Sequence, residues 1–90
     1  MTLAARPHAL EEIRNWLVGR AAFYLERPAT AVDPSVPLVE YGLDSVYALA
    51  FCGDIEDEYD IVVEQTLAWD HPTVDAMAAH LHGILAGEQP

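Results

Sequence analysis

The chain has 90 residues, of which 52% are hydrophobic, and its 15 acidic residues face four arginines and no lysine, which gives a formal charge of −11. This length suits one small domain, and the hydrophobic content argues against a disordered chain. The negative charge disfavours nucleic acid and anionic membrane surfaces as partners and favours positively charged proteins.

The cysteine content and the first residues indicate a reducing compartment. Cys52 is the single cysteine, so no disulfide can form within the chain, and the first residues lack the cationic and apolar segments of a secretion signal. A cytoplasmic location is therefore expected. No apolar run approaches the length of a membrane span. We expect loose ends at residues 1–7 and 87–90, a folded domain over 8–86, and a monomer.

The first predicted element is a helix over residues 8–25. Its apolar residues recur at spacings of three and four, which places them on one helical face. They are Leu10, Ile13, Leu17, Ala21 and Tyr24. A long connection over 26–44 follows, because three prolines prevent a continuous helix there. Gly42 is expected to adopt a backbone angle that other residues resist. The side chains expected to pack this connection down are Val32, Val36, Leu38 and Tyr41.

A second helix is predicted over residues 45–59, with Asp44 or Ser45 as its N-cap. Its expected inward residues are Ala48, Phe51 or Cys52, Ile55 and Tyr59. Four acids at positions 54, 56, 57 and 58 lie toward the C-terminal end, where the helix dipole disfavours them. We interpret these acids as a recognition surface rather than as a source of stability.

The rest of the chain predicts a short extended linker over 60–63, a helical turn or two across 65–69, and a last helix over 73–86. Asp70-His71-Pro72 interrupts the chain before the last helix, and Thr73 is its expected cap. The apolar face of the last helix is formed by Val74, Met77, Ala78, Leu81 and Leu85. No strand pattern occurs, so the predicted fold is all-α, a small bundle of three main helices plus one short helix.

The residue types needed for catalysis or metal binding do not form a recognisable pattern. The four histidines, His8, His71, His80 and His82, are scattered, and Ser45 lacks the flanking glycines of a nucleophile elbow. No zinc spacing and no calcium loop is present. We expect no catalytic residue and no metal site. Trp16 and Trp69 are expected to pack in the core or at its edge.

The order of elements around Ser45 resembles the acyl carrier protein family, including the carrier domains of polyketide synthases. Gly42-Leu43-Asp44-Ser45 is similar to the attachment motif of that family, and Asp70-His71-Pro72-Thr73 is similar to its counterpart before the last helix. The resemblance covers about residues 8–86. Asp44 favours an acyl carrier, since peptidyl carriers more often have a second glycine and a histidine in this motif.

This resemblance implies that Ser45 receives a 4′-phosphopantetheine arm from coenzyme A, installed by a phosphopantetheinyl transferase, and that the arm holds acyl groups as thioesters. The implied partners are acyl-activating, acyltransferase or ketosynthase-type enzymes of polyketide or related acyl-chain biosynthesis. The implied docking residues are Asp44, Val46, Leu49, Gly53, Glu56 and Asp57. The chain departs from the family at Val46, Tyr47 and Ala50, which bears on which partners dock.

Two other functions remain open from the sequence. A peptidyl or aryl carrier domain of a nonribosomal peptide pathway would use the same serine for another cargo. A helical docking domain would use the acidic face without any modification. A small hydrolase is disfavoured, because no general base is placed near Ser45 in the motif.

Overall fold

The computed structural model describes residues 9–87. Its α-helices, in chain order, are α1 (Leu10–Leu25), α2 (Ser45–Tyr59), α3 (Leu67–Asp70) and α4 (Val74–Gly87). Two 3₁₀ helices, η2 (Ala29–Ala31) and η3 (Leu38–Tyr41), lie in the connection between α1 and α2. Residues 9–87 contain no strand, and the predicted all-α bundle of three main helices and one short helix is confirmed.

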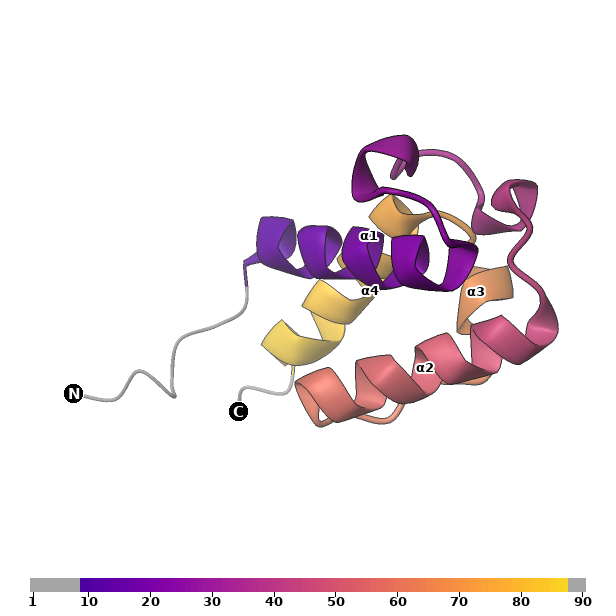
Figure 1. The fold of residues 1–90 in the computed structure, drawn as a ribbon. Coiled ribbons are helices and arrows are strands. Elements are labelled where there is room, and N and C mark those ends of the chain that lie inside the picture. Colours follow the sequence, from indigo (N-terminus) through magenta and orange to yellow (C-terminus); the bar gives the residue numbers. More distant parts are fainter. Residues whose placement is uncertain (1–8, 88–90) are drawn as a thin grey trace.

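The core lies where α1 packs against α4, with α2 crossing the same apolar interior and α3 closing it at the start of α2 (Figure 1). The predicted inward residues of α2 are all buried, and so are the first four of α4, while Leu85 is half-buried. Leu10 is a wrong prediction, since its side chain is 46% exposed. A helical side chain lies over the turn that precedes it. Because Leu10 is the first residue of α1, its side chain has no preceding helical turn to cover.

The ends of the folded part differ slightly from the predicted ones. The expected loose segments 1–7 and 88–90 lie outside the described residues. Gly87 was expected in the loose C-terminal segment but is the last residue of α4. Within residues 9–87, no helix is both long and apolar enough to cross a membrane.

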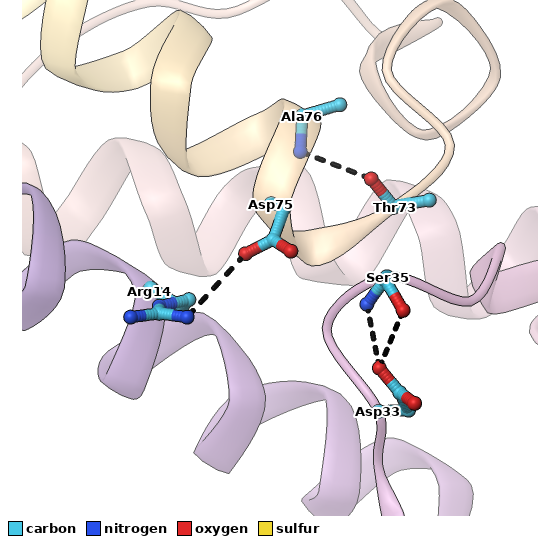
Figure 2. Close-up of polar contacts among 6 residues, drawn as sticks. All are labelled: Arg14, Asp33, Ser35, Thr73, Asp75 and Ala76. Carbon is cyan, nitrogen blue, oxygen red and sulfur yellow. Dashed lines mark hydrogen bonds and ion pairs between the residues drawn. The ribbon is translucent and has the colours of Figure 1, made fainter.

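The connection over 26–44 is held down by its own side chains and by the start of α4. Val32 and Leu38 are buried, while Val36 and Tyr41 are half-buried, so the expected packing is confirmed. Ser35 donates from both its backbone N–H and its hydroxyl to the Asp33 carboxylate, at 2.9 and 2.7 Å, which closes the turn at Pro34 (Figure 2).

Backbone hydrogen bonds tie this connection to the α3–α4 junction. The Leu38 N–H donates to the Pro72 carbonyl at 2.8 Å, and the Asp75 N–H donates to the Pro34 carbonyl at 3.0 Å. The Thr73 hydroxyl accepts from the Ala76 N–H at 3.0 Å and caps α4, as predicted, and Asp75 also lies 3.7 Å from the Arg14 guanidinium (Figure 2). The start of α4 therefore fixes the path of the chain that leads into α2.

A polar network joins α1 to α2. The Arg20 guanidinium lies 2.7 Å from the Asp54 carboxylate, which also accepts a hydrogen bond from the Tyr24 hydroxyl. Burial alone would raise the pKa of Asp54, but the hydrogen bonds from Tyr24 and Arg20 and the charge of Arg20 outweigh it and lower that pKa. Asp54 therefore stabilises the contact between the two helices, contrary to the expectation that the acids of α2 are not a source of stability.

Replacing Asp54→Asn is expected to lower the free energy of unfolding by about 1 kcal/mol, because the pair is part-exposed and screened by water. Urea denaturation followed by circular dichroism measures this difference. Asp57→Asn, at an exposed position on the same helix, is the control and should change stability by less than about 0.5 kcal/mol.

The stability contributed by Asp54 should depend on pH in a defined direction. Its folded-state pKa is lowered, so the contribution is complete above the ordinary aspartate pKa, about 3.9, and is lost as the pH falls through the lowered value. The difference between the wild type and Asp54→Asn should therefore shrink below about pH 4. A difference that grows as the pH falls would contradict the assignment.

Candidate functional site

Ser45 is exposed at the first position of α2, between two buried anchors. Leu43 is 4% exposed and Ala48 is 2% exposed, whereas the side chains from Asp44 to Tyr47 all face solvent. The apolar anchors on either side turn this four-residue stretch outward. The hydroxyl of Ser45 is thus presented at the surface on a helix whose position the core determines.

The turn before Ser45 depends on Gly42. Its φ angle is 97°, in the region that favours glycine, and its N–H donates to the Val39 carbonyl at 3.0 Å. The Leu43 N–H then donates to the Leu38 carbonyl at 3.3 Å, which ends η3 and sends the chain into α2. The predicted backbone role of Gly42 is confirmed.

Asp44 is the N-cap of α2, which settles the choice between Asp44 and Ser45. Its carboxylate accepts from the Tyr47 N–H at 2.9 Å, and its carbonyl accepts from the Ala48 N–H at 2.9 Å. The N–H groups of Ser45 and Val46 have no intrahelical acceptor, since the first turn of any α-helix lacks them. Two amide donors and the positive end of the helix dipole therefore lie beside the Ser45 hydroxyl, a setting that suits a phosphate ester.

Each residue of the Asp70-His71-Pro72-Thr73 motif has a structural contact at the junction of α3, α4 and the long connection. Asp70 accepts from the Thr66 hydroxyl at 2.7 Å, and the Pro72 carbonyl accepts from Leu38 as described above. The rings of His71 and His80 stack with their centroids 4.1 Å apart. The motif therefore helps to fix the position of the connection over 26–44, which leads to Ser45.

The histidine stack was missed from the sequence, where the four histidines look scattered. Burial, followed by the nearby His71, lowers the pKa of His80, with Asp70 acting in the opposite direction. Residues nine positions apart on different elements give no periodic signal, so only the three-dimensional structure brings these two rings together. The stack joins α4 to the turn that precedes it.

The predicted docking residues divide between two sides of α2. Helical geometry places Val46, Gly53 and Asp57 opposite the buried stripe, and places Leu49 and Glu56 on the same side as Ser45. Asp44 precedes them at the cap. Two of these docking residues are exposed apolar side chains, Val46 at 71% and Leu49 at 49%. Leu49 lies one turn after Ser45, next to where a group attached to Ser45 would begin.

Two of the four acids on α2 have structural partners. Besides Asp54, the Glu56 carboxylate accepts from the Val63 N–H at 2.9 Å and holds the linker after α2 against the helix. Asp57 and Glu58 are exposed. The charge that α2 offers to a partner is therefore concentrated on these last two acids.

The remaining candidate side chains are mainly structural. Cys52 is buried, its thiol donates to the Glu64 carbonyl at 3.7 Å, and burial raises its pKa, so it behaves as a small hydrophobe. Trp16 is half-buried and packs edge-on against Tyr59, whereas Trp69 is 46% exposed on α3. Within residues 9–87, no three His, Cys, Asp or Glu side chains are grouped to hold a metal ion.

A helical bundle that presents an exposed serine at the start of its second long helix is the arrangement expected of a carrier domain. The model of the family described as the phosphopantetheine attachment site matches residues 15–81. The chain therefore belongs to this family. Its members carry a covalently attached 4′-phosphopantetheine and are non-catalytic carriers, often within multienzyme synthases.

The relatives are long synthases and small carrier proteins. The chain is 39% identical over 70 residues to the polyketide synthase ThaQ of Burkholderia thailandensis, a match that covers 78% of this chain and 3% of the synthase. The chain thus spans only a few per cent of the length of such curated relatives. It is similar to the acyl carrier protein LipD of Actinoplanes friuliensis, with 42% identity, a TM-score of 0.73 and 88% of each chain covered.

The fold is also that of the HMG-ACPI domain from the CurA module of Lyngbya majuscula, with a TM-score of 0.86 and 23% identity over 100% of this chain and 91% of that domain. The chain is a phosphopantetheine-attachment carrier domain of the kind found in polyketide synthases, and its role is to tether intermediates. The expected family, fold and carrier function are confirmed.

Replacing Gly42→Ala is expected to lower the free energy of unfolding by about 1 kcal/mol, because a residue with a Cβ resists a positive φ. No atom lies within 4 Å of the position a Cβ would take at Gly42, so the cost comes from the backbone alone. Urea denaturation measures it.

Gly53→Ala is the matched control, since Gly53 lies inside α2 and also has no atom within 4 Å of the position that a Cβ would take. It is expected to raise stability by about 0.5–1 kcal/mol through helix propensity. A Gly42→Ala variant as stable as the wild type would show that the turn before Ser45 does not need the left-handed conformation.

Proposed function

We propose that Ser45 is the residue to which 4′-phosphopantetheine is attached. The observation that carries this proposal is the exposure of the Ser45 hydroxyl at the first position of α2, between the buried anchors Leu43 and Ala48. The chain has one other serine, Ser35, whose hydroxyl donates to the Asp33 carboxylate within a turn. Ser35 is exposed as well, but its hydroxyl is committed to this local contact.

The residues around Ser45 fit the group. A phosphodiester on its oxygen would lie near the N–H groups of Ser45 and Val46, which lack intrahelical acceptors, and at the favourable end of the helix dipole. The Asp44 carboxylate carries like charge, but it accepts from the Tyr47 N–H and is exposed to water, which screens the repulsion. When bound, 4′-phosphopantetheine supplies a thiol that holds acyl groups as thioesters.

The role of Ser45 in loading is that of a nucleophile used once. Its oxygen attacks the phosphorus of the coenzyme A pyrophosphate that carries the pantetheine, the bond to the other phosphate breaks, and the hydroxyl proton leaves to a base of the transferase. A magnesium-dependent phosphopantetheinyl transferase fits this step, because the Asp44 carboxylate beside Ser45 is engaged by the Tyr47 N–H and the base is left to the other protein. The exposed position of Ser45 suits reaction inside another protein's active site.

The proposed partner surface is the outward side of α2 together with Asp44. Its apolar centre is formed by Val46 and Leu49, and its charge comes from Asp44 and Asp57. A positively charged partner is attracted to an acidic carrier and oriented by it before contact. The partners proposed are the transferase and the acyl-activating, acyltransferase or ketosynthase-type enzymes of polyketide or related acyl-chain biosynthesis.

Tethering explains how a carrier without catalytic groups promotes synthesis. A flexible attached arm raises the effective concentration of the cargo at each active site that the carrier docks to. The cargo is proposed to be an acyl chain, as Asp44 before the serine suggests. A peptidyl or aryl cargo would use the same site, and loading assays with the corresponding activating enzymes distinguish these cargoes.

Ser45→Ala is expected to abolish loading, while Ser35→Ala, the matched control, should load as the wild type does. Each protein is incubated with coenzyme A, magnesium and a promiscuous phosphopantetheinyl transferase, and its intact mass is measured. The wild type should gain the mass of one phosphopantetheine group. An equal gain in Ser45→Ala would overturn the assignment of the site, and an unchanged wild-type mass would overturn the carrier function.

Asp57→Lys is expected to lower the kcat/KM of transferase loading about tenfold at low ionic strength and less at high salt. Asp57 is chosen over Glu56 because replacing Glu56 would also remove its hydrogen bond with Val63. Glu11→Lys, an equal charge change at an exposed position on α1, is the control and should have a much smaller effect. Equal kcat/KM for Asp57→Lys and the wild type at low salt would remove Asp57 from the docking surface.

A further inference from the structure

A groove between α1 and α2 lies on the side of α2 away from Ser45. It is an open hollow of about 310 Å³ lined by Trp16, Arg20, Asp54, Asp57 and Glu58. Helical geometry places Asp54 on the opposite side of α2 from Ser45. Apart from Asp57, these residues are outside the docking surface proposed above.

The groove is negatively charged although an arginine lines it. Arg20 and Asp54 form an ion pair at 2.7 Å, so their charges compensate each other. The net charge of the groove lining is therefore set by Asp57 and Glu58 and is negative. Tyr59 packs against Trp16, which lines the groove. Burial first, and then the charges of Glu58 and Glu12, raise the pKa of Tyr59 to about 12. The hollow therefore favours a cation.

One wall of the groove is formed by an aromatic residue, Trp16. The Trp16 ring packs edge-on against Tyr59, with ring centroids 5.4 Å apart and an interplanar angle of 78°. This contact holds the half-buried indole in place beside the two exposed acids. Tryptophan is the aromatic residue that attracts lysine and arginine most strongly through its ring face.

An exposed aromatic strip continues from the groove toward the start of α2. Phe23 is 64% exposed, and the Arg20 guanidinium lies 4.6 Å from the centre of its ring. Tyr47 is 39% exposed and packs on Tyr24 with ring centroids 5.7 Å apart. Tyrosine, tryptophan and arginine are the residue types most enriched among the side chains that dominate binding energy at protein interfaces.

We propose that this α1–α2 seam, formed by Trp16, Arg20 and Phe23 on α1 and by Tyr47, Asp57 and Glu58 on α2, docks a protein segment that carries an arginine or lysine beside an apolar side chain. The cation enters the groove between Trp16 and the two acids, and the apolar side chain covers Phe23 and Tyr47. The inference rests on the proposed function for the kind of partner, an enzyme of the same synthase system. It adds α1 to the docking surface.

The test is a titration of the ¹⁵N-labelled 90-residue protein with the N-acetylated, C-amidated peptide Leu-Arg-Leu, followed through the indole N–H signals of its two tryptophans. The Trp16 signal should shift saturably with peptide concentration. Trp69, on α3, should not shift and serves as the internal reference. The peptide Leu-citrulline-Leu, which is neutral and of similar shape, should leave Trp16 nearly unchanged.

Two charge variants localise the binding. The double variant Asp57→Asn/Glu58→Gln should bind the arginine peptide roughly fivefold more weakly. The control Glu11→Gln/Glu40→Gln, which removes two charges from other exposed positions, should bind it as the wild type does. Equal shifts at Trp16 and Trp69, equal shifts with the citrulline peptide, or no shift at millimolar arginine peptide would each overturn the proposal.

The same spectra separate two other outcomes. A Trp16 signal that shifts with protein concentration in the absence of peptide would assign the seam to a second copy of the chain and overturn the proposal of a separate partner. Loading of Ser45, measured by intact mass, does not depend on the peptide. A protein that loads but does not bind the peptide disproves the seam alone, and one that binds but does not load disproves the attachment site alone.

Discussion

The burial of Leu38 and Leu43, together with the hydrogen bonds between the long connection and the start of α4, is the constraint on which the site depends. Leu38 is anchored by its side chain, which is buried in the core, and by the hydrogen bond from its N–H to the Pro72 carbonyl. Gly42 then reverses the chain, and Leu43 returns to the core. Ser45 faces solvent because the residues on both sides of it are committed to the interior. The motif before α4 therefore serves a site that lies on another helix.

The distribution of charge explains how an acidic chain can be stable and still have a negative surface on α2. Asp54 is compensated by Arg20 and Tyr24, and Glu56 accepts from the backbone of Val63, so these acids support the fold. Asp57 and Glu58 remain exposed at the end of α2 and give it a negative surface. The helix dipole disfavours acids there, so these two positions do not add to the stability of the helix. Acids that support the fold and acids that remain exposed thus occupy neighbouring positions of one helix.

The sequence predicted the long elements and their caps because their signals are local. The spacing of apolar residues in α2 and α4, the caps Asp44 and Thr73, and the backbone role of Gly42 follow from periodicity and from single-residue preferences. The contacts that are distant in sequence could not be predicted. Arg20 and Asp54 are 34 positions apart, and His71 stacks on His80 across two elements. Leu10 was wrongly predicted to lie on the buried face, because the spacing of apolar residues does not indicate where a helix extends beyond the core.

The central claim is that one serine of this chain carries the arm and that the fold presents it for that purpose. Tandem mass spectrometry of the wild-type protein, after loading by the transferase and proteolysis, tests the claim most directly because it assigns the added group to a residue. The account predicts one phosphopantetheine group, found on the peptide that contains Gly42-Leu43-Asp44-Ser45, with the added mass on Ser45. A group found on Ser35 or on any other residue would contradict it.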